Sequence, residues 1–237
     1  MKQKPLRDRI LIAGTGRCGT SYLTQILTAV GESTGFSGPF DRYYPENMAG
    51  QEMLIPTDTD DEYLERYDRF KIIKDPRFCF TLSTLLSADK ISVNHVYIMI
   101  RDIHSASLSR VKADLLWGAD AENVIDDGSK IIRQTAFMYE AFGSLMESVV
   151  MNDLPHTFIK FPLCTEDSRY LYDQLSKGPL LSDISYDDFK TVHGEITNRR
   201  NASMMDGKIR LKRYKSLGSV SKEDAYKINH EALWDLQ

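Results

Sequence analysis

From Arg9 to Ser21 the chain reads RILIAGTGRCGTS, a short apolar run that passes directly into a glycine-rich stretch. Residues 9–13 are mostly apolar and rich in isoleucine, which predicts a buried strand. After the glycines, residues 21–30 carry apolar side chains at helical spacing, and Gly31 is suited to end a helix. The sequence therefore predicts a strand, a glycine-rich loop and a helix, in that order.

The predicted loop, from Gly14 to Ser21, has the composition of an anion-binding loop. Glycines let the backbone curl so that successive N–H groups point inward, and the following helix adds the positive end of its dipole. The spacing matches a P-loop, except that Thr20 stands where a lysine normally contacts the β- and γ-phosphates. A nucleoside triphosphatase needs that lysine, whereas an enzyme whose donor has no γ-phosphate does not.

Three further segments predict buried strands, at residues 70–74, 96–100 and 157–161. Helices are expected at residues 105–116, 131–150, 168–176 and 222–236, and loops at 32–61 and 177–185. Such alternation indicates an α/β fold in which helices flank both faces of a central, mostly parallel sheet. With its loop after the first strand, the chain is expected to adopt a three-layer fold like that of P-loop NTPases.

Composition narrows the class of protein. At 237 residues and 42% hydrophobic, with no internal linker, the chain is expected to form one domain over residues 1–237. The net charge of -4 argues against nucleic-acid binding, and no apolar run is long enough for a membrane helix or secretion signal. The three cysteines form no metal-binding or disulfide pattern, so a cytoplasmic location is expected.

A second pattern, an arginine followed by a serine, comes after the strand predicted at residues 96–100. Arg101 ends that strand, and Ser109 comes eight residues later in a predicted helix. Together with the sequence RCGTS at residues 17–21, this pair resembles two signatures of sulfotransferases that use 3'-phosphoadenosine 5'-phosphosulfate (PAPS). That family has (K/R)-x-G-T-(T/S) after its first strand, and an Arg and a Ser at this spacing after a later strand.

The resemblance implies a reaction and a set of binding residues. A sulfuryl group would pass from PAPS to an acceptor hydroxyl or amine, leaving 3'-phosphoadenosine 5'-phosphate (PAP), with no metal required. Arg101 and Ser109 would hold the 3'-phosphate. The 5'-phosphosulfate would be held by Gly16, Arg17, Cys18, Gly19, Thr20 and Ser21. Arg17 would also stabilise the charge that grows on the leaving phosphate.

Other site residues are implied by the same resemblance. Lys74, in a Lys-Asp-Pro-Arg turn, is expected to contact the transferring sulfonate or the acceptor. The general base is expected at Glu52, and the alternatives are Glu32, Asp41 and Glu46. The acceptor is expected to be a small molecule, such as a carbohydrate or lipid, and a homodimer is compatible with the sequence.

The basic segment at residues 210–221 occupies the place of the lid that closes over the nucleotide in the family, ahead of a last helix. Arg213 and Lys215 are therefore candidate nucleotide contacts.

Two other functions stay open. One is a kinase for small molecules or nucleotides that uses ATP and Mg²⁺, with Asp75 holding the metal. The other is a nucleotide-binding regulatory protein without catalysis.

Overall fold

The fold is given by a computed structural model that describes residues 6–40, 42–44, 47–48, 70–113, 115–116 and 126–215. Its centre is a sheet of four parallel strands in the order β4-β1-β5-β6. These strands are β1 (Leu6–Ala13), β4 (Ile72–Lys74), β5 (Ile91–Ile100) and β6 (His156–Lys160). A separate antiparallel pair consists of β2 (Arg42–Tyr44) and β3 (Asn47–Met48). The prediction of an α/β fold with a mainly parallel sheet is confirmed.

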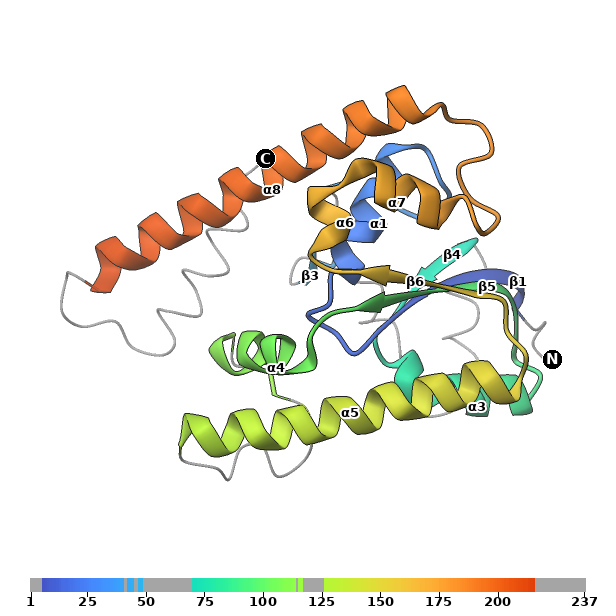
Figure 1. Cartoon of the computed structure of the whole chain (residues 1–237), viewed down its shortest axis with the longest axis horizontal. Helices are drawn as coiled ribbons and strands as arrows, with labels where there is room; N and C mark the ends of the chain where they lie inside the picture. Colours follow the sequence, from blue (N-terminus) through green and yellow to red (C-terminus); the bar gives the residue numbers. More distant parts are fainter. Residues whose placement is uncertain are drawn as a thin grey trace.

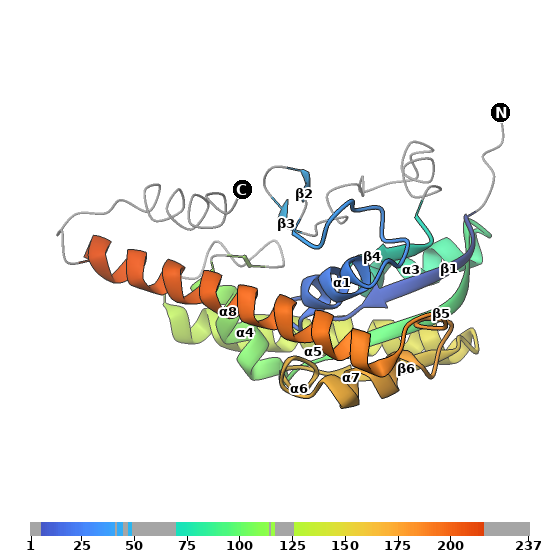
Figure 2. The ribbon, with the colours of Figure 1, turned by 90° about the horizontal axis from the view of Figure 1, so that it is seen from above.

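Helices cover both faces of the sheet, so the fold has three layers (Figure 1, Figure 2). The first helical layer contains α1 (Thr20–Ala29), α6 (Leu163–Glu166), α7 (Ser168–Leu175) and α8 (Tyr186–Lys215). The second contains α3 (Phe78–Ser87), α4 (Ile103–Lys112) and α5 (Asp127–Met151). In the described part of the chain, no helix is both long and apolar enough to cross a membrane.

Alternate side chains of the strands enter the two helical layers. On β1, Ile10 and Ile12 pack with α1, whereas Leu11 and Ala13 pack with α3 and α5. Strand β5 shows the same alternation, because successive residues of a strand point to opposite faces of a sheet. A parallel sheet covered on both faces needs apolar residues at every position, which explains the continuous apolar runs in the sequence.

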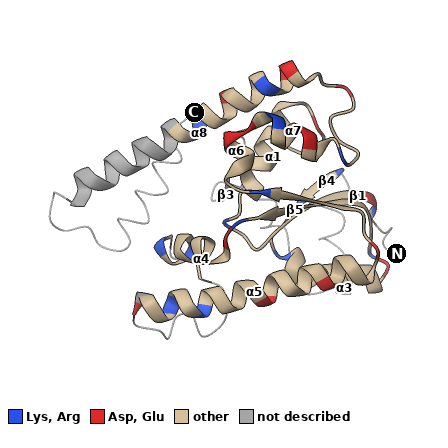
Figure 3. Cartoon of the chain, viewed as in Figure 1, with Lys and Arg blue, Asp and Glu red and all other residues tan. Residues whose placement is uncertain are grey.

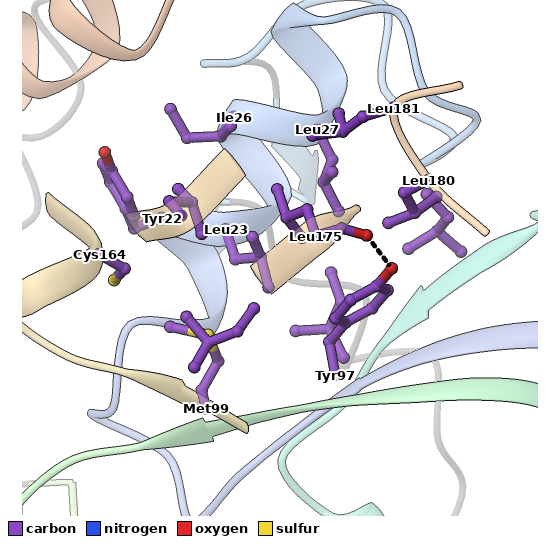
Figure 4. Packing of buried hydrophobic residues seen from close by; sticks show 14 of the residues in the cluster. Tyr22, Leu23, Ile26, Leu27, Tyr97, Met99, Cys164, Leu175, Leu180 and Leu181 are labelled. Atoms are coloured by element: carbon purple, nitrogen blue, oxygen red, sulfur yellow. Dashed lines mark hydrogen bonds between the residues drawn. The ribbon is translucent and has the colours of Figure 1, made fainter. Parts of the chain in front are cut away.

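The layer around α1 is a well-packed core (Figure 4). Leu23 and Ile26 of α1 are fully buried in the same cluster as Met99 of β5. The Tyr97 hydroxyl donates a hydrogen bond to the carbonyl oxygen of Leu175, at 2.7 Å, which ties α7 to β5. Because α1 is packed against the sheet in this way, the loop that precedes it has a fixed position at the end of β1.

All four predicted strands are present, and the helices predicted at residues 21–30, 105–116, 131–150 and 168–176 correspond to α1, α4, α5 and α7. Helices α3, α6 and α8 were not predicted. One expectation needs correction: residues 210–215 are not a separate segment ahead of the last helix, because they form the end of α8. The helix predicted at residues 222–236 lies outside the described residues.

Candidate anion-binding site

The loop after β1 and the loop after β5 lie at the same edge of the sheet, because the two strands are parallel neighbours. The next strand of this sheet after β1 is β4, which pairs on one side of β1, whereas β5 pairs on the other side. The winding direction therefore reverses at β1. In doubly wound sheets, ligands bind beyond the carboxyl ends of the strands at such a reversal.

The loop after β1 has a backbone conformation that depends on its glycines. Gly14, Gly16 and Gly19 have φ angles of 148°, 75° and 94°, and Arg17 is left-handed with φ 55°. A β-carbon at Gly14 would lie 2.7 Å from both Cys18 Sγ and the Met99 carbonyl oxygen. Glycine at this position is thus required both by the backbone angles and by the close approach of β5.

Helix α1 begins directly at the loop, with Gly19 as its N-cap. No side chain caps this end with a hydrogen bond, and the first turn contains no acidic residue. The first N–H groups of a helix have no partners within the helix, and together with the helix dipole they attract an anion. The start of α1 is therefore suited to hold a phosphate or sulfonate oxygen.

Three predicted anion-binding residues meet at this edge. Arg17 Nε donates a hydrogen bond to Ser109 Oγ at 3.1 Å, although the two residues are 92 positions apart in sequence. Arg101 Nη1 donates to the carbonyl oxygen of Arg17 at 2.9 Å. The structure therefore brings the loop after β1 and the Arg–Ser pair after β5 into one cluster.

The cluster is strongly cationic. Although Arg17 is exposed at the surface, its pKa lies below the ordinary value, mainly because nearby protein atoms exclude water from the guanidinium. The charge of Arg101 lowers the Arg17 pKa further. Arg110, which is buried and donates to the Leu115 carbonyl oxygen at 2.6 Å, has its pKa lowered to about 10 by burial and then by Arg17. A bound anion would relieve this mutual repulsion of guanidinium groups.

A further arginine approaches the cluster from α8. Arg200 Nη1 donates to Gln25 Oε1 of α1 at 2.6 Å, and its guanidinium lies 5.7 Å from the centroid of the Tyr22 ring. Burial lowers the pKa of Arg200, and the charge of Arg17 contributes to the shift. Neither Arg110 nor Arg200 was predicted as a site residue. Arg110 adjoins Ser109 in sequence, whereas nothing in the sequence marks Arg200.

The buried side chains of Cys18, a residue of the loop, and of Lys74 at the end of β4 lie beneath the loop backbone. Cys18 is fully buried, and burial raises the pKa of its thiol, so the group stays protonated at neutral pH. The Lys74 ammonium acts in the opposite direction on this pKa, which places its charge near Cys18. Lys74 itself is only 1% exposed at the end of β4. Cys18 therefore serves as a small packing residue, and Lys74 adds positive charge below the loop.

Asp75, the next residue after Lys74, is buried and binds within its own turn. One carboxylate oxygen accepts a hydrogen bond from the Arg77 backbone N–H at 2.7 Å, and the Arg77 side chain lies 3.3 Å away. This carboxylate therefore shapes the turn that leads into α3.

Phe161, which follows β6, lies against both Arg101 and the loop after β1. The Arg101 guanidinium carbon lies 5.3 Å from the centroid of the Phe161 ring. A β-carbon on Gly19 would lie 2.5 Å from Phe161 Cδ2, so the ring also packs directly against the loop. Phe161 was not predicted as a site residue, because an aromatic residue after a strand is in most cases part of the core.

The remaining predicted residues fall into two groups. Glu32 is placed by the structure at the far end of α1, where its Oε1 accepts a hydrogen bond from the Leu181 backbone N–H at 3.0 Å. A helix of ten residues spans about 15 Å, so Glu32 is remote from the loop that precedes α1. The described part of the chain does not include the predicted base Glu52, its alternatives Asp41 and Glu46, or the side chains of Arg213 and Lys215.

The chain was compared with protein-family models, curated proteins and solved structures, and none of the three comparisons gave a match.

Proposed function

We propose that this protein is a sulfotransferase that moves the sulfuryl group of PAPS to an acceptor hydroxyl or amine. The observation that supports the proposal best is the contact of Arg17 with both Ser109 and Arg101. PAPS carries two separate anionic groups on one adenosine. Two anion-binding elements from distant parts of the chain, joined by hydrogen bonds at one sheet edge, fit a ligand of that kind.

In this proposal the loop and the start of α1 bind the 5'-phosphosulfate, and Arg101 with Ser109 binds the 3'-phosphate. The loop residues involved are Gly16, Arg17, Cys18, Gly19, Thr20 and Ser21. The Ser109 hydroxyl, which accepts a hydrogen bond from Arg17, keeps its own proton to donate to a phosphate oxygen. Charge-assisted hydrogen bonds of this type are about twice as strong as neutral ones.

The reaction itself needs few groups. The acceptor oxygen or nitrogen attacks the sulfur of PAPS, the bond between sulfur and the 5'-phosphate oxygen breaks, and the acceptor proton passes to a general base. PAP and the sulfated acceptor leave. Arg17 stabilises the negative charge that grows on the 5'-phosphate, with Lys74 close beneath the loop. We assign the base to Glu52, and the acceptor to a small molecule such as a carbohydrate or lipid.

Two observations make a kinase a weaker alternative. Thr20, at the position of the P-loop lysine, is buried as the first residue of α1. Asp75, the carboxylate that would hold Mg²⁺ in a kinase, already accepts hydrogen bonds from Arg77. We therefore favour a P-loop-type fold that has been adapted to a donor without a γ-phosphate.

The deciding experiment is a calorimetric titration of PAP and AMP, which differ only in the 3'-phosphate. Wild-type protein should bind PAP at least about tenfold more tightly than AMP, because charge-assisted hydrogen bonds contribute about 1.5–3 kcal/mol each. In Arg101→Ala/Ser109→Ala this preference should disappear, because PAP loses both contacts to its 3'-phosphate, whereas AMP loses only the support that these two residues give to the loop. Arg7→Ala is the matched control. Arg7 pairs with Asp89 at the amino-terminal ends of β1 and β5, away from the loops that would bind the ligand.

Equal affinity of the wild-type protein for PAP and AMP would remove the basis of the proposal. Tighter binding of ATP that depends on Mg²⁺ would instead identify the protein as a kinase. Tight PAP binding without any sulfuryl transfer from PAPS, across a panel of hydroxyl and amine acceptors, would favour the regulatory alternative.

A further inference from the structure

Helix α5 presents an apolar stripe on the side that faces away from the sheet. Ile132, Tyr139 and Val150 are 72%, 61% and 60% exposed. Ala136 and Gly143, also exposed, lie between them on the helix. These five positions are three, four or seven residues apart and therefore share one side of the helix. An exposed apolar stripe of this length marks an interaction surface more often than a free surface.

Charged residues follow one edge of the stripe at a spacing of seven. They are Arg133, Glu140 and Glu147, and all three are exposed. Apart from the aspartates at its N-terminal end, α5 carries its basic residues in the first half and its acidic residues in the second half (Figure 3). The charge beside the stripe is therefore positive toward the N-terminal end of α5 and negative toward its C-terminal end.

We propose that this side of α5 is the interface of a homodimer, in which the α5 helices of two protomers pack antiparallel. A twofold axis near Glu140 places Arg133 of one protomer opposite Glu147 of its partner, and symmetry repeats the pair. In parallel packing, with the twofold axis along the helices, the charged edges of the two protomers would lie on opposite sides of the contact, so these pairs would not form. An interface around a twofold axis must be self-complementary, and the two Arg133–Glu147 pairs meet that condition. The two copies of Glu140 lie next to each other at the axis, at the exposed edge of the stripe, and their repulsion opposes part of this gain.

The sizes of the side chains agree with the same arrangement. Near the axis, Tyr139 of one protomer faces Gly143 of its partner, where an added β-carbon would meet no atom within 4 Å. Toward the ends of the contact, Ile132 faces Val150. Large side chains thus face small ones and apolar residues face apolar ones, along a helix of 25 residues, about 37 Å long.

The test is the association state of the full chain, measured by sedimentation equilibrium. Wild-type protein should be a dimer. Tyr139→Asp should yield monomers, because it places a charge in the centre of the stripe. Arg133→Glu and Glu147→Arg should each weaken the dimer about tenfold, since each turns two attractive pairs into repulsive ones. The double variant Arg133→Glu/Glu147→Arg should restore wild-type affinity. Glu195→Arg, an exposed change on α8, is the control.

The substituted side chains are exposed, so the midpoint of thermal unfolding at concentrations where the chain is monomeric should match that of wild type. A wild-type protein that stays monomeric at its highest soluble concentration overturns the proposal. So does a dimer that Tyr139→Asp leaves intact, because its interface would then lie elsewhere. Failure of the double variant to recover affinity would rule out the antiparallel pairing of Arg133 with Glu147.

Discussion

The Arg101 guanidinium donates a hydrogen bond to the backbone carbonyl oxygen of Arg17, at 2.9 Å, and so fixes the loop after β1 to the end of β5. The Arg17 side chain in turn donates a hydrogen bond to Ser109 Oγ, which joins the loop to α4. In the proposed PAPS site each arginine therefore has two functions, because it supplies positive charge for the ligand and also contacts the other binding element. Substitutions at Arg101 are expected to change loop geometry as well as phosphate affinity.

Arg17→Ala should lower the turnover number of sulfuryl transfer by about 100-fold or more, because the guanidinium stabilises charge that appears only during the reaction. Arg17→Lys should recover part of this loss, since lysine restores the charge without the planar fork of donors. Steady-state kinetics with PAPS would measure both effects, and circular dichroism would verify folding. Wild-type turnover in a well-folded Arg17→Ala protein would exclude Arg17 as the phosphosulfate contact.

Glu52→Gln should keep PAP affinity and lose turnover, because it replaces a proton acceptor with a group of nearly the same shape. Glu32→Gln is the matched control. Its amide oxygen can still accept the hydrogen bond from the Leu181 N–H, and the residue lies at the far end of α1, so activity should be retained. If Glu32→Gln lost turnover while Glu52→Gln kept it, the assignment of the base would be reversed.

The sheet and the loop could be predicted because both leave strong local signals. Strands of a parallel sheet are buried on both faces, so β1 and β5 appear as continuous apolar runs. The loop requires glycine at Gly14 and Gly19, where a side chain would strike Cys18 or Phe161. Arg101 and Ser109 were identified through their resemblance to a signature of the sulfotransferase family, and the structure confirms only that they meet the loop.

The missed features depend on contacts that are distant in sequence. In α8, Phe189, His193 and Ile196 are buried at helical spacing, but the surrounding residues are polar and hide the pattern. Helix α3 follows a Lys-Asp-Pro-Arg turn, and a proline at this position is typical of a turn, so it gives no sign that a helix begins two residues later. Arg200 could not be linked to the loop, because that link requires the packing of α8 on α1.

Stability should fall as the pH rises above about 9, because of three buried thiols. Burial raises the pKa of Cys79 and Cys164 to about 12, and it raises the pKa of Cys18 as well. The unfolded chain releases these protons above pH 9 while the folded chain retains them, so alkaline conditions favour unfolding. Each thiol would contribute a slope of up to about 1.4 kcal/mol per pH unit between the two pKa values.

Urea unfolding at pH 8 and pH 10 would measure this slope. Cys164→Ala should unfold more easily at pH 8 because it leaves a small cavity, yet its stability should fall less between the two pH values than that of wild type. Equal slopes for wild type and Cys164→Ala would show that this thiol does not contribute to the pH dependence.

Phe161→Leu should weaken PAP binding about twofold to fivefold, because a cation over the ring of a partly exposed aromatic residue such as Phe161 is stabilised by about 0.5–1 kcal/mol. The Arg101 guanidinium carbon lies 5.3 Å from the ring centroid, and leucine keeps an apolar contact without the π system. Phe161→Tyr should bind PAP like wild type. AMP affinity should not change in either variant, since AMP lacks the 3'-phosphate that Arg101 would bind.

In an Arg101→Ala background, Phe161→Leu should have no further effect on PAP. Calorimetric titration of these proteins forms a double-mutant cycle, and an equal loss with and without Arg101 would show that the ring acts through its packing on Gly19 instead.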